Sequence, residues 1–183
     1  MANLPGFGNP PTFAGQSSSL VARLLQYCEW GVEGLTTEQL SDTRGGLTNS
    51  IGWDVWHVVR TVDNIVHFVF EREQPVWLQQ GFHEQWGLPK VDQGTGQDPN
   101  DAYSLRFPSP EEFNRYTTAV AAAVVPRLAG MSAEYLSQVQ TIRPWGEVPR
   151  IEAIGHGLIG HGNGHLGRVS YARTILGLKG LPF

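Results

Sequence analysis

The sequence predicts an all-α protein that folds as a bundle of helices. Apolar residues recur at helical spacing along most of the chain, and residues that commonly cap or end helices bound each of these segments. The 183 residues, 40% of them hydrophobic, suffice for one sizeable core and fit one globular domain better than two.

Two long helices are predicted in the first half of the chain. Ser17–Ser19 can cap a first helix, which Gly34 can end. A second helix is predicted from Ile51 to Phe70, capped by Asn49 or Ser50, and the residues from Arg72 on can prolong it until Gly81. Its many β-branched residues favour a strand when taken alone, but the segment is too long for one and lacks the alternation of a strand.

Two more helices are predicted in the second half. Ser109 and Pro110 are a typical helix start, with Glu112 placed to complete a capping box, and Pro126 is expected to kink or end this helix. A last helix is predicted from Pro149 or Arg150 to Leu176.

The connections between these helices differ in what they suggest. Residues 90–108 are polar and rich in turn formers, and so long a connection in a compact domain is often a lid or a pocket wall. Residues 138–148 are predicted to be irregular. Residues 1–16, rich in Pro and Gly, are predicted to be an extended arm that precedes a domain over residues 17–183.

Charge and cysteine content exclude several classes of protein. The net charge is −4 and the 13 Lys and Arg residues form no run, which argues against nucleic acid as a partner. No uncharged apolar run approaches the roughly 18 residues needed to span a membrane, and the N-terminus does not resemble a signal peptide. Cys28 is the only cysteine, so no internal disulfide or thiolate cluster can form, and the reducing cytoplasm is the expected location.

His161 and His165 have a spacing that suits a metal ion. Residues four apart on a helix lie roughly 40° apart around its axis and about 6 Å along it, so both imidazoles can reach one ion. The alternative is a pair of unrelated surface histidines. Gly162 follows His161, so the general base of an H-E-x-x-H metalloprotease is missing.

His57 is the natural third ligand. It lies in the most apolar stretch of the chain, where a buried imidazole needs a hydrogen-bond partner or a metal. The alternative is a core histidine satisfied by a neighbouring group. A bundle can bring the second and last helices together, and bundle cores are where such sites are built. The many glycines between residues 155 and 167 weaken a helix, so we expect them to allow close packing there.

Three segments resemble the DinB/YfiT-like superfamily: NSIGWDVWHVVRTVDNIV, VWLQQGFHEQWGLP and HGNGHLGRVSYARTILGLKG. The resemblance extends over nearly all of residues 17–179. It implies a four-helix bundle with long loops in which His57, His161 and His165 hold one divalent metal ion. The Trp-Gly loop and the Pro-Trp-Gly segment resemble the branch of thiol-dependent transferases that use mycothiol or bacillithiol. The glycine-rich last helix departs from the usual pattern of the family.

The resemblance implies a metal-dependent transferase that joins a low-molecular-weight thiol to a small electrophilic substrate. Zinc and nickel are the expected ions, and the reactive group is expected to be a metal-bound water or thiol. Arg60 could hold a substrate carboxylate, Asp63 could orient a ligand, and the other candidates for substrate binding are Trp56, Asn64 and Arg168. The alternative is a non-catalytic bundle in which the ion mainly joins two helices.

A homodimer is also expected. The N-terminal arm contains Pro5, Phe7 and Phe13, an apolar and aromatic set that could cover a second subunit, and similar bundles often pair.

Overall fold

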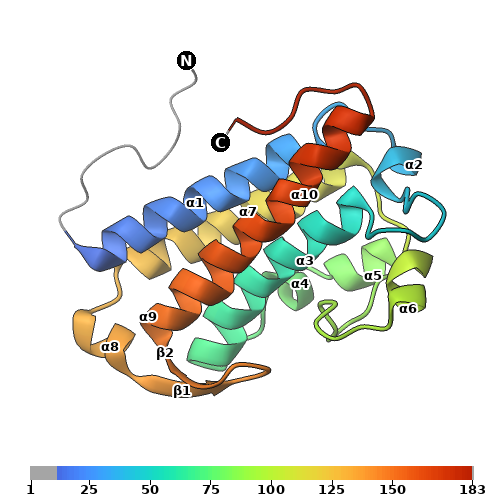
Figure 1. Ribbon diagram of the computed structural model, residues 1–183. Coiled ribbons are helices and arrows are strands. Elements are labelled where there is room, and N and C mark those ends of the chain that lie inside the picture. Colours follow the sequence, from blue (N-terminus) through green and yellow to red (C-terminus); the bar gives the residue numbers. More distant parts are fainter. Residues whose placement is uncertain (1–11, 183) are drawn as a thin grey trace.

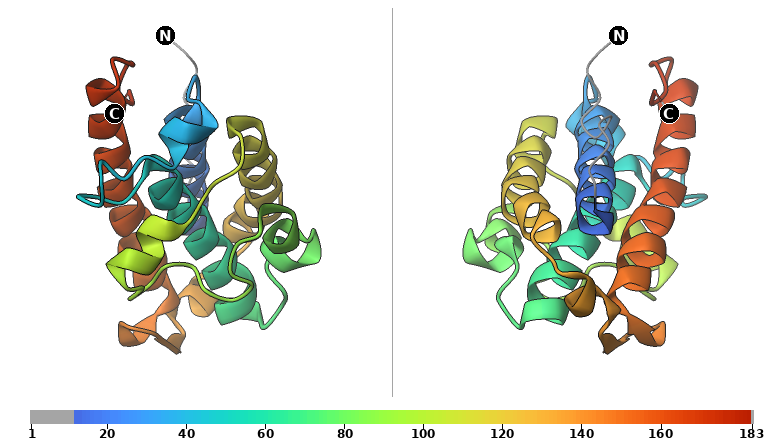
Figure 2. Two further views of the ribbon diagram at one scale, coloured as in Figure 1. Left: turned by 90° about the vertical axis from the view of Figure 1, so that its right-hand side faces the viewer. Right: turned by 90° about the vertical axis from the view of Figure 1, so that its left-hand side faces the viewer.

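The computed structural model describes residues 12–182 and confirms an all-α bundle (Figure 1). Four long helical segments run side by side, and the two side views separate them clearly (Figure 2). They are α1 (Phe13–Val32), α3 (Ile51–Asp63) continued by the π-helix η1 (Asn64–Phe70), α7 (Pro110–Ala129), and α10 (His161–Ile175) preceded by α9 (Arg150–Glu152) and the π-helix η2 (Ala153–Gly160). The segment α3 packs against α1, α7 and α10 and is buried along its whole length.

Short elements fill the connections between the long helices. The helices are α2 (Thr37–Leu40), α4 (Val76–Gln79), α5 (Phe82–Trp86), α6 (Pro99–Ser104) and α8 (Ala133–Ser137), and the strands are β1 (Val139–Ile142) and β2 (Gly146–Pro149). The two strands pair antiparallel, with Val139 opposite Pro149 and Ile142 opposite Gly146. The prediction of an irregular segment at 138–148 is therefore wrong, because this segment is a hairpin whose turn ends at Gly146, with φ of +82°.

The first helix begins earlier than predicted. The hydroxyl of Thr12 accepts a hydrogen bond from the backbone N–H of Gly15 at 3.0 Å, so Thr12 is the cap instead of the serines. Residues 13–16 of the expected arm are thus helical, and residues 1–11 lie outside the described residues.

The ends of the second and third helices also differ in part from prediction. Ser50 caps α3 through the backbone N–H of Trp53, at 3.1 Å, as predicted. The helix ends after Phe70 instead of continuing toward Gly81, because Arg72 adopts a left-handed conformation with φ of +61°. Pro126 does not end α7, which continues to Ala129.

A buried carboxylate at the end of α3 connects this helix to the loop and the helix behind it. Asp63 is fully buried and accepts hydrogen bonds from the backbone N–H groups of Val76 and Trp77, both at 2.9 Å, and from the hydroxyl of Tyr116 at 2.8 Å. This carboxylate joins α3, α4 and α7, so the expectation that Asp63 orients a metal ligand is wrong.

Within residues 12–182, no helix has the length and apolar character needed to cross a membrane.

The glycines of the last helical segment allow close packing at only some positions. A Cβ at Gly157 would lie 2.4 Å from the ring of Trp145, and one at Gly162 would lie 2.8 Å from Leu24. Nothing lies within 4 Å of the corresponding positions at Gly164 and Gly167. The expectation therefore holds for the inner face of this segment and fails for its exposed face.

We predict opposite effects for two Gly→Ala substitutions in helices. A Cβ at Gly52 would lie 2.7 Å from both the Leu40 carbonyl oxygen and the Phe107 ring, so Gly52→Ala should destabilise the fold by about 1–3 kcal/mol. Gly167→Ala meets nothing and should stabilise it by about 0.8–1 kcal/mol. Urea denaturation gives the free energy of unfolding of both variants. Equal changes in the two variants would contradict the close packing at Gly52.

Candidate metal centre

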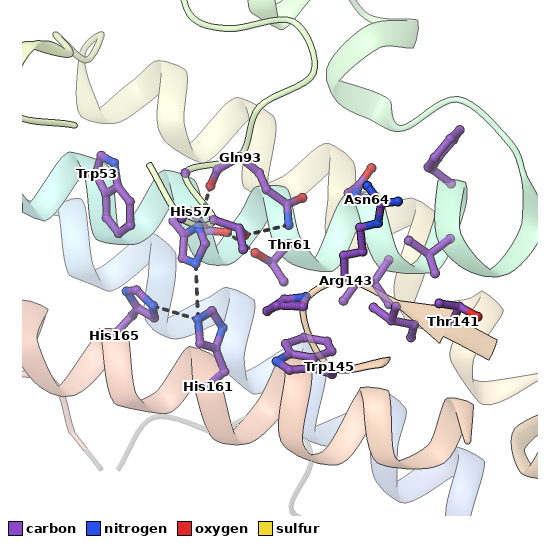
Figure 3. A pocket seen from close by; sticks show the side chains of 18 of the residues that line it. Trp53, His57, Thr61, Asn64, Gln93, Thr141, Arg143, Trp145, His161 and His165 are labelled. Carbon is purple, nitrogen blue, oxygen red and sulfur yellow. Dashed lines mark hydrogen bonds between the residues drawn. The ribbon is translucent and has the colours of Figure 1, made fainter. Parts of the chain in front are cut away.

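Three histidines from two packed helical segments converge on one point. His57 comes from α3, and His161 and His165 come from consecutive turns of α10 (Figure 3). The Nε2 atom of His161 lies 3.3 Å from Nε2 of His57 and 3.0 Å from Nε2 of His165. One ring nitrogen from each lies within 4.8 Å of the other two, so the three could hold a metal ion.

Hydrogen bonds on the far side of the rings set this orientation. Nδ1 of His57 lies 2.5 Å from the carbonyl oxygen of Gln93, and Nδ1 of His165 lies 2.7 Å from Oδ1 of Asp54. The Gln93 carbonyl oxygen can only accept, so we assign the proton of the neutral His57 ring to Nδ1, which leaves a lone pair on Nε2. Beside Nδ1 of His165 lie the Asp54 carboxylate, an acceptor, and Nη2 of Arg168, a donor 2.6 Å away. With its proton on Nδ1, toward Asp54, His165 also has a lone pair on Nε2. His161 has a hydrogen bond with the backbone of Gly157, one turn earlier.

Burial favours the neutral form of His57 and His161. Loss of solvent lowers the pKa of His57 to about 4, mainly because the charged form is poorly hydrated there. The pKa of His161 is also lowered, first by burial and then by the nearby His165 and Arg168. Neutral imidazole is the form that binds a metal ion.

The donor set fits a small divalent cation. Tetrahedral zinc with Zn–N bonds of ~2.0–2.1 Å separates two ligand nitrogens by roughly 3.3 Å. The two separations from Nε2 of His161, 3.3 Å to His57 and 3.0 Å to His165, are close to this spacing. Lone pairs that face one another in a buried place repel unless a proton or a cation lies between them. A cation at this point would remove that repulsion.

The histidines form one end of a cavity of about 570 Å³. Its walls come from one face of α3 and η1, from the loop 93–96, and from the hairpin residues 141–145. Trp53 stacks on His57 with ring centroids 4.8 Å apart, and Trp145, from the hairpin, lies beside His161 (Figure 3). The long connection 90–108 therefore supplies a pocket wall, as its length suggested.

The predicted substrate-binding residues fall in different places. Asn64 lines the cavity. Arg168 donates to Asp54 at 2.6 Å and so lies behind His165. Trp56 is fully buried, and Arg60, 1% exposed, donates to the Val91 carbonyl oxygen and lies over the Trp77 ring.

Neither Trp56 nor Arg60 lines the cavity. Around the helix axis, Arg60 lies about 60° from His57 and Trp56 about 100° from it, and both side chains are buried in the core. The same helical geometry places Trp53, four residues before His57, against the histidines.

Two residues of the site, Asp54 and Gln93, were not predicted from the sequence. Asp54 is 2% exposed, and an acidic residue in so apolar a helix was a signal, because a buried carboxylate needs a partner. Gln93 acts through its backbone carbonyl, which every residue type has, so no residue type could have revealed it.

We predict that the double variant His161→Ala, His165→Ala loses stoichiometric metal. Two of the three nitrogen donors are then missing, so the ion should be lost on dialysis. Elemental analysis of protein purified without a His-tag measures this. His156→Ala is the control, because His156 is exposed on the same helical segment and is not part of the cluster. One ion per chain in the double variant would contradict the assignment.

A second prediction concerns Asp54. Asp54→Asn removes the negative charge behind His165 and should weaken metal binding by about 10–100-fold, because such partners fix the ring and raise its basicity. Competition with a chelator of known affinity gives the dissociation constants. Arg106→Gln is the control, because Arg106 bonds only to backbone carbonyls of its own loop. An unchanged affinity in Asp54→Asn would show that the hydrogen bond does not support the ligand.

Comparison with known proteins agrees with this architecture. A crystal structure of a conserved protein from Enterococcus faecalis has a similar fold, with a TM-score of 0.77 at 22% identity over 91% of this chain and 98% of that chain. No curated protein is similar enough to count as a match. The family model described as the DinB superfamily matches residues 22–169, which is most of the chain. This protein therefore belongs to the DinB superfamily.

Proposed function

We propose that this protein is a metal-dependent transferase that joins a low-molecular-weight thiol to a small electrophilic substrate. His57, His161 and His165 would hold one divalent ion, zinc or nickel. The observation that carries the proposal is that three neutral nitrogen donors face a cavity of about 570 Å³, which leaves room for an exchangeable ligand.

The charge of the site suits a thiol. When bound, a divalent ion favours the thiolate over the thiol, which makes the sulfur a nucleophile at neutral pH. The ligands are all neutral, so they do not reduce the charge of the ion. Asp54 is the nearest acid, and Arg168 pairs with its two oxygens at 2.6 and 3.3 Å. The site would therefore keep most of its positive charge.

The thiol has to come from solution. Cys28 is the only cysteine of the chain, and its side chain is fully buried in the core of α1. Burial raises the pKa of the Cys28 thiol well above its usual range, so this group cannot act as a nucleophile.

The chain itself supplies binding and exclusion of water. Trp53 and Trp145 form apolar walls next to the histidines, and Thr61 and Asn64 add polar side chains on the same helical face. These groups can orient a small molecule so that its reactive end lies at His57 and His161.

We also propose that the protein works in the cytoplasm as a homodimer. The single buried cysteine fits a reducing compartment. Light scattering at high concentration tests the dimer, and a monomer of about the sequence mass of 20.2 kDa would contradict it.

We predict that thiol transfer depends on the metal. Removing the ion, by chelation or by His57→Ala, should lower turnover by roughly two orders of magnitude or more, because the ion's contribution is several kcal/mol. A coupled assay that offers several low-molecular-weight thiols with electrophilic acceptors measures this. His83→Ala is the control, because His83 lies outside the cavity.

Two results would contradict the transferase. Equal rates in metal-loaded and chelated protein would remove the role of the ion. No turnover with any thiol, in protein that retains one ion per chain, would favour the non-catalytic bundle.

A further inference from the structure

Two arginines line the cavity at a distance from the histidines. Arg72 follows the end of η1, and Arg143 lies in the turn between β1 and β2. No Asp or Glu lines the cavity among residues 12–182. This part of the cavity therefore has a positive charge that no acid in its wall offsets.

Neither arginine has an acidic partner elsewhere in the described residues. The acids next to Arg72 are engaged: Glu73 pairs with Arg127 at 2.7 Å, and Glu71 accepts a hydrogen bond from the hydroxyl of Tyr135. Arg72 lies over the ring of Phe68, 5.7 Å from its centroid, and no hydrogen bond of Arg143 is formed within residues 12–182. Both guanidinium groups remain available to a ligand.

Arg72 has a backbone conformation that is uncommon for residues with a side chain. Its φ of +61° is left-handed, and its N–H bonds to the Phe68 carbonyl oxygen at 3.1 Å to close the helix. Glycine is the favoured residue at such a helix end, and a side chain there costs free energy. The side chain of Arg72 lines the cavity despite this cost.

The helical face that begins at His57 leads to these charges. Cavity-lining residues follow His57 at steps of three and four: Thr61, Asn64, Phe68 and Arg72. Asn64, two turns after His57, lies about 10 Å along the axis. The side chain of Arg143 extends toward Asn64, on the opposite side of the cavity from His165 (Figure 3).

We propose that Asn64, Arg72 and Arg143 form a subsite for an oxyanion, a carboxylate or phosphate group of the small molecule whose reactive end faces the histidines. Only the statement about the reactive end rests on the proposed function. Guanidinium forks bind carboxylate and phosphate oxygens in pairs, and the Asn64 amide can donate a further hydrogen bond. Ile65, Phe68 and Val69 provide apolar surface for the atoms between the two ends.

The test uses calorimetric titration of the zinc-loaded full chain with two pairs of probes. Mercaptosuccinate and thioglycerol are thiols with and without carboxylates, and succinate and inorganic phosphate separate the two oxyanions. We expect mercaptosuccinate to bind at least about tenfold more tightly than thioglycerol, the size of a hydrogen bond to a charged group. Whichever of succinate and phosphate has the lower dissociation constant identifies the oxyanion that the subsite prefers.

Substitutions then locate the binding. Arg72→Gly and Arg143→Gln should each weaken mercaptosuccinate binding about tenfold and leave thioglycerol unchanged. Arg72→Gly should also keep or raise the melting temperature, because glycine suits a left-handed helix end. Arg44→Gly is the matched control, since Arg44 also has a positive φ, +54°, and lies outside the cavity.

The outcomes separate this inference from the transferase. Equal affinities for the two thiols, together with no measurable binding of either oxyanion, would overturn the subsite. Oxyanion binding that survives both substitutions would also overturn it. If neither thiol binds the zinc-loaded protein, the proposed function fails, and the loss of oxyanion binding in Arg72→Gly still supports the subsite.

Discussion

The candidate site depends on hydrogen bonds made by the ring nitrogens that face away from it. Gln93 and Asp54 accept at Nδ1 of His57 and His165, and this turns their Nε2 atoms toward His161. Each acceptor belongs to a part of the fold that is fixed for other reasons. Asp54 is in the first turn of the buried helix α3, and Gln93 is in a loop that packs on Trp53. The geometry of the three donors is therefore a property of the folded chain.

The loop that contains Gln93 is held closely by the same residues. The indole N–H of Trp53 donates to the side-chain oxygen of Gln97 at 3.1 Å. Gly94 has φ of +90°, and a Cβ there would lie 2.6 Å from the Trp53 ring, so only glycine fits between loop and helix. Trp53 thus supports His57 in two ways: it stacks on the ring and it anchors the loop that orients it.

The helical periodicity of the sequence was enough to predict the long helices and to single out the candidate metal ligands. The spacing of His161 and His165 put both on one face of a helix, and the apolar surroundings of His57 indicated a buried imidazole in need of a partner. Their convergence depended on a prediction about packing, that the second and last helices are neighbours, and the structure has this contact.

Other features could not be predicted because they depend on tertiary geometry. The strands of the hairpin at 139–149 have only four residues each, too few for a clear alternating pattern. The hairpin forms a wall of the cavity because Trp145 packs against Gly157. Arg60 was favoured by its closeness to His57 in sequence, but its side chain extends into the core and lies over the Trp77 ring. Arg72 and Arg143 lie far from His57 in sequence and reach the same cavity only after folding.

X-ray absorption spectroscopy of the metal-loaded protein is the sharpest test of a three-histidine site, because it reports the atoms bound to the ion. We predict three imidazole nitrogens at ~2.0–2.1 Å from zinc and at least one further light-atom ligand. A thiol added to the protein should replace that ligand with sulfur at about 2.3 Å. A coordination shell without three imidazoles, or one that no added thiol changes, would contradict an open three-histidine site that binds thiols.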